Sequence, residues 1–294
     1  MKNKSLAAHL ALFCANLIYG INYSVAKDVM GQYVQPFGFI LSRVIGATLL
    51  FWLAHSLFYS EKVDKKDLPK LFLLGLFGVA VNQLLFFKGL DLTTPINASI
   101  IMTSNPILVL IAANFLLKER LTLSKIFGIL LGLTGALTLL FVKSDFSFGS
   151  QTWKGDLMVF LNAASYGVYL VMVKPLMQKY KPITVIKWVF LFGLIIVFPF
   201  GISEFTEIDF HSFTPKIWFE FLFVIVATTF LAYLLNIYAL KRVSPSVVST
   251  YIYLQPLLAS IFAILMHQDT INWVKIISAI MIFAGVYLVS KRSS

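Results

Sequence analysis

The sequence is poor in charged residues and in cysteine. Asp, Glu, Lys and Arg together make up 13% of the 294 residues, whereas apolar residues make up 59%. Soluble domains carry about 25% charged residues, so this chain has too little polar surface to cover a soluble globule of its size. Its single cysteine, Cys14, excludes an internal disulfide and is expected to be a small buried side chain. The composition predicts a protein that lies in a lipid bilayer.

The sequence also lacks the residue groups on which common intramembrane enzymes depend. Its four histidines, His9, His55, His211 and His267, are scattered, and no pair of them has the spacing of metal ligands. No pair of carboxylates lies in the middle of an apolar run, and the GxSxG turn of serine hydrolases does not occur. We therefore expect a protein that is not an enzyme, with no catalytic residue, no bound metal and no cofactor.

Ten apolar runs of membrane-spanning length account for most of the chain. A helix rises about 1.5 Å per residue, so about 20 apolar residues cross a hydrocarbon core of roughly 30 Å. The runs cover residues 6–26, 36–59, 68–87, 95–117, 124–142, 154–173, 182–202, 215–239, 245–266 and 272–290. The alternating segments of membrane β-barrels are absent from the sequence. The sequence predicts an all-α polytopic membrane protein with ten transmembrane helices.

The positive charge follows this predicted topology and does not form one patch. The formal net charge is +11, which would suit nucleic acid if the charge were concentrated. With the N-terminus in the cytoplasm, however, 17 Lys and Arg residues fall on inner segments and six on outer segments, while Arg43 lies within the second run. This excess agrees with the positive-inside rule. We expect both termini to be cytoplasmic and expect no nucleic acid partner.

The chain contains a duplication. A shift of 150 residues aligns residues 88–139 with 238–289 without a gap, and ten of the 52 aligned positions are identical. Pro95 falls on Pro245, and Pro106 falls on Pro256. Because each copy has five helices, an odd number, the second copy must enter the membrane in the opposite sense. The sequence thus predicts two inverted five-helix repeats, over residues 6–142 and 153–290.

Each copy carries a proline in the middle of an apolar run. Pro106 ends the stretch TSNP and Pro256 ends the stretch YLQP. A proline inside a helix removes a backbone donor, and irregular backbone at membrane depth is tolerated only against protein or a water-filled cavity. Interrupted segments at corresponding places in two repeats indicate a binding site near the bilayer centre. Pro106 and Pro256 are therefore candidate hinges; the alternative is that they only kink packed helices.

The stretches around these prolines resemble a known family. The first, NASIIMTSNPILVLIAANFLLKERLT, and its counterpart ALKRVSPSVVSTYIYLQPLLASIFAILMHQDTINWVK are similar to the signature half of an EamA-type module. Two such modules make up carriers of the drug/metabolite transporter superfamily, and the resemblance covers residues 6–142 and 153–290. It implies a ten-helix carrier of the bacterial inner membrane, often an exporter of amino acids or related metabolites, with a cavity between the halves. The resemblance does not specify a substrate.

Twelve polar or aromatic side chains in the predicted helices are candidates for binding the substrate. They are Asn16, Tyr19, Tyr23, Arg43, Asn82, Thr103, Asn105, Asn162, Tyr166, Tyr233, Tyr253 and Gln255. Asn16, Tyr19 and Tyr23 share one helical face, because side chains three and four residues apart stack. A cavity with aromatic faces and a few amide and hydroxyl groups suits a small amphipathic solute, although the same groups could only join helices. Arg43 must face protein, water or a counter-charge, so it contacts either an anionic ligand or a structural partner.

Charged residues near the predicted helix ends are candidate gates. Lys27, Lys88 and Asp269 lie at the outer face and Glu119 at the inner face, where they could equally be interface anchors or solvated turns. No Asp or Glu lies in the middle of a predicted span. Coupling to protons would therefore use such edge groups, and exchange or facilitated diffusion are the alternatives.

The sequence thus predicts a secondary transporter that moves a small metabolite by alternating access. The substrate would lie between helices 1, 3 and 4 and their counterparts 6, 8 and 9. The alternatives are an efflux carrier for drugs or toxic compounds and a membrane scaffold or receptor that transports nothing. A ridge of small residues, Gly128, Gly132 and Gly135, allows close packing either within the fold or between the subunits of a homodimer.

Overall fold

The computed structural model describes residues 2–30, 32–93, 95–142, 152–265 and 273–290. Their helices follow from the apolar runs, because within a bilayer backbone groups can pair only with one another. Seven helices among the described residues are long and apolar enough to cross a membrane, and residues 6–22 and 123–138 lie in two shorter apolar helices. The prediction of an all-α membrane fold is confirmed.

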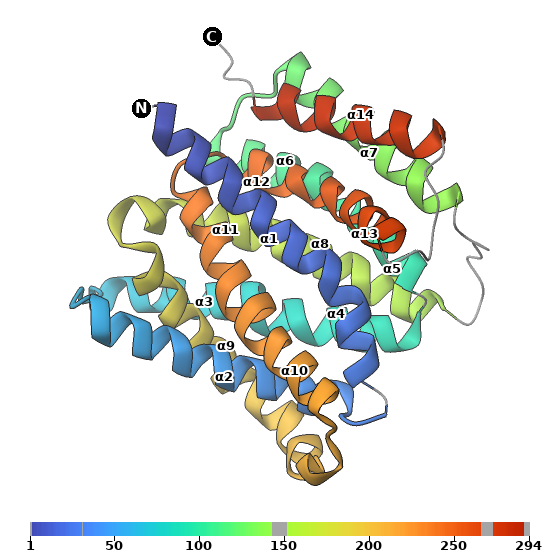
Figure 1. Cartoon of the computed structure of the whole chain (residues 1–294). Helices are drawn as coiled ribbons and strands as arrows, with labels where there is room; N and C mark the ends of the chain where they lie inside the picture. Colours follow the sequence, from blue (N-terminus) through green and yellow to red (C-terminus); the bar gives the residue numbers. More distant parts are fainter. Residues whose placement is uncertain (1, 31, 94, 143–151, 266–272, 291–294) are drawn as a thin grey trace.

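The ten predicted runs correspond to ten helical segments of the described chain, some of them divided (Figure 1). The first repeat consists of α1 (Lys2–Val29), α2 (Pro36–Phe58), α3 (Leu68–Gly75), α4 (Val81–Leu92), α5 (Pro95–Met102), α6 (Asn105–Leu117) and α7 (Leu123–Val142). The second repeat consists of α8 (Trp153–Lys179), α9 (Pro182–Thr206), α10 (Pro215–Phe223), α11 (Ala232–Leu240), α12 (Pro245–Thr250), α13 (Leu254–Leu265) and α14 (Trp273–Ser290). Several helices begin at proline, which fits the first turn because the N–H there has no partner within the helix.

Two segments in each repeat are interrupted, at corresponding places. A π-helix, η2 (Leu76–Ala80), joins α3 to α4, and a longer one, η4 (Val224–Leu231), joins α10 to α11. Residues 103–104 form a turn between α5 and α6, and the 3₁₀-helix η5 (Tyr251–Tyr253) joins α12 to α13. A shift of 150 residues superposes each interruption of the first repeat on, or directly beside, one of the second.

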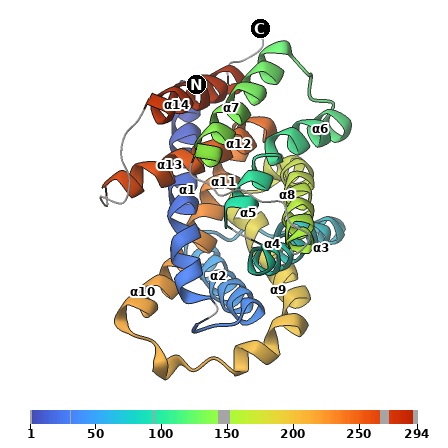
Figure 2. The same ribbon diagram turned by 90° about the vertical axis from the view of Figure 1, so that its right-hand side faces the viewer.

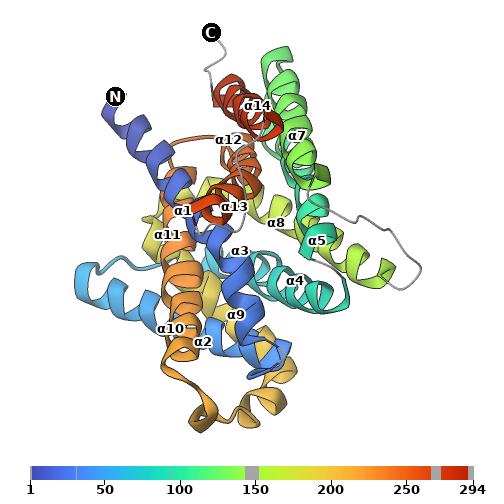
Figure 3. The same ribbon diagram turned by 45° about the vertical axis from the view of Figure 1, so that its right-hand side comes forward.

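The helix contacts follow the same symmetry. Helix α1 of the first repeat packs against α11 of the second, and α8 of the second packs against α4 of the first (Figure 3). Helix α2 packs against its counterpart α9, and α7 packs against its counterpart α14 (Figure 2). Each repeat therefore completes the core of the other, and the fold consists of two inverted repeats that interlock.

The connections between helices gather at two opposite ends of the molecule. At one end, Lys179 forms ion pairs with Asp64 and Asp67, so the connection before α3 meets the connection after α8. Two shorter helices, η1 (Lys65–Asp67) here and η3 (Phe210–Ser212) at the other end, lie within these connections. We call the end that contains η1 the lysine-rich end and define it by residues 59–67, 179–181 and 241–244.

The opposite end joins the start of α2 to the end of α9. The Glu204 carboxylate accepts hydrogen bonds from the backbone N–H groups of Phe37 (2.6 Å) and Gly38 (2.9 Å), which lie in the first turn of α2. A carboxylate is favourable there because the first N–H groups of a helix lack partners within the helix. Lys216 pairs with Asp28 at the same end, at 2.9 Å. Since Asp28 lies near the end of α1, that helix begins at the lysine-rich end, where α14 also ends (Figure 1).

The glycine ridge packs within the fold. A Cβ atom added at Gly128 would lie 2.8 Å from the backbone oxygen of Gly285, and one added at Gly135 would lie 2.9 Å from the backbone oxygen of Ser278. The ridge therefore brings α7 and α14 into close contact and is not free to join two subunits. The expectation that Cys14 is buried is wrong: it is exposed on α1, on the surface of the helix bundle.

Candidate functional site

A cavity lies between the two repeats, beside the interrupted helices. Its volume available to the centres of water molecules is about 110 Å³. The first repeat lines it with residues from α1, α2, α4 and α5, and the second with residues from α8, η4, α11, α12, η5 and α13. The cavity is thus bounded by the helices expected to hold a substrate, with α2 in addition.

Twelve of the lining residues carry amide, hydroxyl or guanidinium groups: Asn16, Tyr19, Asn22, Arg43, Asn82, Gln83, Asn162, Tyr166, Thr228, Tyr233, Asn236 and Gln255. Five are apolar: Phe86, Phe87, Met102, Val248 and Ile252. Among these described lining residues, Arg43 is the one charged side chain. Such a wall fits a small solute with a largely apolar body and a few polar groups.

Helix α1 is joined to the second repeat by two amide contacts at the cavity wall. The Nδ2 group of Asn236 in α11 donates to the Tyr19 hydroxyl at 3.1 Å. The Nε2 group of Gln255 in α13 donates to Asn16 Oδ1 at 2.9 Å. These bonds hold the polar groups of α1 in fixed positions along the cavity.

Asn82 in α4 makes the corresponding link from the other repeat. Its Oδ1 atom accepts from the Tyr233 hydroxyl at 3.3 Å, and its backbone oxygen accepts from Asn162 Nδ2 at 2.6 Å. A carbonyl oxygen has two lone pairs, so it can accept from Asn162 in addition to a backbone N–H of its own helix. The π-helix η2 itself supplies a further acceptor for α8, since the backbone oxygen of Phe77 accepts from the Ser165 hydroxyl at 2.7 Å.

Arg43 enters the cavity wall from α2, in the eighth position of that helix. It is buried, and its Nε donates to Thr229 Oγ1 at 3.0 Å. Thr229 lies in the π-helix η4 and donates to the backbone oxygen of Val224 at 2.7 Å. The centre of the guanidinium lies 4.4 Å from the ring centroid of Phe87 and 5.7 Å from that of Phe39. Aromatic faces attract a cation, so this position holds the guanidinium without a carboxylate beside it.

The amide residue before each proline ties the divided helix to its neighbour. Asn105 Nδ2 donates to the backbone oxygen of Ala163 in α8 at 2.7 Å, and Gln255, its counterpart in the second repeat, contacts Asn16 in α1. Pro106 is the second residue of α6 and Pro256 the third residue of α13, where a missing N–H costs little. The prolines therefore start new helical segments, and their role as hinges stays a prediction.

The structure brings eight of the twelve predicted residues into the cavity wall: Asn16, Tyr19, Arg43, Asn82, Asn162, Tyr166, Tyr233 and Gln255. Three others lie outside this wall. The Thr103 hydroxyl donates to the backbone oxygen of Ile100, Asn105 is bound to α8, and the fully buried Tyr253 ring packs on Gly132. The side chain of Tyr23 lies outside the described residues.

Two of the four predicted gate residues are described, and both form ion pairs away from the cavity wall. Lys88 pairs with Asp91 at 2.7 Å, and Glu119 pairs with Lys125 at 2.6 Å. The side chain of Lys27 and the whole of Asp269 lie outside the described residues. Their role as gates stays a prediction.

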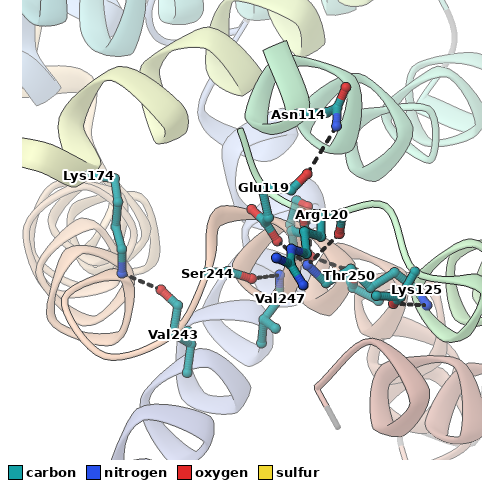
Figure 4. A network of polar contacts seen from close by, with 12 residues as sticks. Asn114, Glu119, Arg120, Lys125, Lys174, Val243, Ser244, Val247 and Thr250 are labelled. Atoms are coloured by element: carbon teal, nitrogen blue, oxygen red, sulfur yellow. Dashed lines mark hydrogen bonds and ion pairs between the residues drawn. The ribbon is translucent and has the colours of Figure 1, made fainter. Parts of the chain in front are cut away.

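The surroundings of Glu119 join three parts of the fold (Figure 4). Asn114 of α6 donates to the Glu119 backbone oxygen at 3.0 Å, which fixes the turn between α6 and α7. Helix α6 packs against α12, whose first turn is capped by the Ser244 hydroxyl. Lys174 of α8 donates to the backbone oxygen of Val243 at 2.5 Å. The Lys174 side chain thus joins α8 to the connection between α11 and α12 through a backbone oxygen.

Several lining residues were not among the predicted set. Asn22 lies three residues after Tyr19, and Gln83 and Phe86 follow Asn82 by one and four residues. The helical spacing of Asn22 and Phe86 could have identified them. The apolar residues of the wall carry no such signal, because an apolar side chain in a membrane helix is equally suited to face lipid.

Comparisons with known proteins identify the family. The profile of the EamA-like transporter family matches residues 6–141 and 153–291, which together make up most of the chain. The chain belongs to the EamA-like transporter family. This family membership makes it a membrane transporter of the drug/metabolite transporter superfamily and confirms the resemblance seen around the two prolines.

The relatives of this EamA-like chain extend over almost its whole length. An uncharacterized transporter of Archaeoglobus fulgidus is 26% identical over 86% of this chain and 90% of its own. The uncharacterized transporter YyaM of Bacillus subtilis is 23% identical over 98% and 94%. The protein WALLS ARE THIN 1 of Arabidopsis thaliana is 24% identical over 97% and 83%.

A crystal structure shares the fold of this EamA-like chain with a TM-score of 0.78 at 20% identity, over 96% of both chains. At that identity the likeness concerns the fold alone. It supports the arrangement of the ten segments and carries no information on substrate.

Proposed function

We propose that this transporter exports a small organic metabolite, an amino acid or a related solute, across the bacterial inner membrane. The observation that supports this function is the cavity between the inverted repeats, with its wall of amide, hydroxyl and aromatic groups. Inverted repeats give a carrier two equivalent ways to pack around one central site, so rocking of one repeat against the other exposes the site to each side in turn. The interrupted helices at the cavity supply backbone that can change shape.

The lysine-rich end faces the cytoplasm in this proposal. It collects Lys62, Lys65, Lys66, Lys181 and Lys241, and cytoplasmic connections carry the excess of positive charge. The even number of spans agrees with α1 beginning and α14 ending at one common end. Both termini are then cytoplasmic.

The experiment that tests the function begins with a panel of metabolites and purified protein. A solute at 100 times its dissociation constant adds about 2.7 kcal/mol to the stability of a protein that it binds only in the folded state. Compounds that raise the melting temperature are then tested for flux in proteoliposomes, with and without a pH gradient, against protein-free liposomes.

Each result of this experiment has a defined meaning. Flux of a metabolite in proteoliposomes supports the proposal. Stabilisation and flux only with unrelated amphipathic drugs would identify an efflux carrier. Stabilisation without flux of any compound would mean that the protein is a receptor or scaffold and would overturn the proposal.

A further inference from the structure

The charge of Arg43 has no counter-charge among the residues that the structure describes. The residue is 3% exposed, and none of the ion pairs of the described chain includes it. Its Nε is occupied by Thr229, while its Nη1 has no hydrogen-bond partner. A neutral hydroxyl and two aromatic rings do not replace the hydration that a buried guanidinium loses, so the site favours a negatively charged ligand.

The Arg43 side chain lies in the cavity wall. It lines the cavity together with Phe87, whose ring lies against the guanidinium centre at 4.4 Å. With Nε held by η4, no described residue accepts a hydrogen bond from the terminal nitrogens of the guanidinium, and a carboxylate in the cavity would supply that acceptor. The planar guanidinium matches the two oxygens of a carboxylate better than a point charge does.

The remainder of the described wall offers hydrogen bonds but no second charge. Asn22 Oδ1 and Asn162 Oδ1 are buried acceptors without a donor, and Phe86 and Met102 add apolar surface. An ammonium group would find no carboxylate in this wall. A dianion such as a phosphate monoester would find one guanidinium for two charges. The wall therefore matches a single negative charge on an uncharged body.

We propose that the substrate is an organic monoanion, in which one carboxylate binds Arg43 and an uncharged, largely apolar body lies against Phe86 and Met102. An N–H or O–H group on that body donates to Asn22 or Asn162. This inference rests on the proposed transport function and narrows its substrates to the related acids, since it excludes zwitterionic amino acids and cationic drugs.

A series of ligands that share one carbon skeleton and differ in charge tests the inference on the wild-type protein. The series consists of hydrocinnamate, its neutral amide, phenylpropylamine and zwitterionic phenylalanine, with acetate and isovalerate as smaller carboxylates. Binding is measured by calorimetry on protein in nanodiscs. We expect hydrocinnamate to bind at least about tenfold more tightly than the amide and the amine, because a hydrogen bond between charged groups is stronger than a neutral one.

Substitutions then assign this preference to one residue. Arg43→Gln should weaken hydrocinnamate binding by about 10- to 100-fold and leave the amide unchanged, whereas Arg43→Lys should keep part of the preference. Arg242→Gln is the matched control, because Arg242 is exposed after α11, where it lies over Tyr238 outside the cavity. If Arg43→Gln does not fold, the ligand series on the wild-type protein still decides the question.

Three results would overturn the inference: equal or tighter binding of phenylpropylamine or phenylalanine, an unchanged preference in Arg43→Gln, or no binding of any of the three carboxylates. The outcome is separate from that of the transport proposal. Binding of hydrocinnamate that depends on Arg43, without flux in proteoliposomes, would refute transport and leave the anion site. Flux of another solute that is unaffected by Arg43→Gln would refute the anion site and leave transport.

Discussion

A single methyl group at the crossing of α7 and α14 should destabilise the whole fold. A Cβ atom at Gly285 would lie 2.6 Å from the backbone oxygen of Gly128 and 2.7 Å from the backbone nitrogen of Gly132. Both atoms belong to the backbone of α7, so no side chain can rotate away and the two helices must separate. Gly285→Ala is therefore a direct test of the close packing between the last helices of the two repeats.

The expected effect follows from two opposing contributions. Forcing extra volume into a packed contact costs about 1–3 kcal/mol, whereas alanine is favoured over glycine inside a helix by about 0.5–1 kcal/mol. A net loss of up to about 2.5 kcal/mol in the free energy of unfolding is expected for Gly285→Ala. Gly167→Ala in α8 is the matched control, because the nearest atom to its new Cβ is Val109 Cγ2 at 3.4 Å. The control should be neutral or slightly stabilised.

The free energy of unfolding is measured in mixed micelles with increasing dodecyl sulfate, using tryptophan fluorescence, and the oligomeric state by light scattering. Equal stability of Gly285→Ala and Gly167→Ala would refute the reasoning, because the added Cβ overlaps backbone atoms at position 285 and makes only ordinary contacts at position 167. A Gly285 variant that folds normally but changes its oligomeric state would instead place the ridge between subunits.

Three further predictions concern the site and the lysine-rich end. Asn105→Leu should lower the free energy of unfolding by about 1–3 kcal/mol in the same micelle assay, because a buried carbonyl of α8 loses its donor; full stability would show that this amide does not join the helices. Tyr19→Phe should reduce flux in proteoliposomes by about 2- to 10-fold, because a hydrogen bond contributes about 0.5–1.5 kcal/mol. The control Tyr33→Phe should not reduce flux, because Tyr33 lies outside the cavity wall. Equal rates for the two variants would contradict this prediction. Lys179 holds the pKa of Asp64 below its ordinary value of 3.8. The wild type should therefore be more stable than Asp64→Asn at pH 7 and lose this advantage as the pH falls below 3.8. A difference in melting temperature that persists at pH 2 would exclude this ion pair as its source.

Sequence patterns predicted the parts of the fold that depend on local composition. The ten segments follow from apolar length, and the interruption near Pro106 follows from the chemistry of proline. The π-helices were not predicted, because the stretches LFGVA and VIVATTFL are ordinary apolar sequence and their extra residue is accommodated by packing against other helices. No local rule distinguishes them from a regular helix.

In the candidate site, too, the sequence predicted some features and could not predict others. Polar residues in apolar runs are rare enough to be noticed, and most of the predicted ones line the cavity. The partner of Arg43 could not be inferred, since Thr229 lies 186 residues further along the chain. The sequence left open whether Arg43 contacts an anionic ligand or a structural partner, and only the fold shows that its described neighbours are a hydroxyl and aromatic rings.

The unequal interruptions of the two repeats have a consequence for the conformation that opens to the other side. The π-helix η4 spans eight residues and its counterpart η2 five, while η5 is a 3₁₀-helix where the first repeat has a turn. In a rocking carrier, the two repeats exchange roles between its end states. Under the proposed mechanism the backbone of each repeat is a template for the other, so threading residues 6–142 onto the second repeat and 153–290 onto the first would predict the shape of the opposite state.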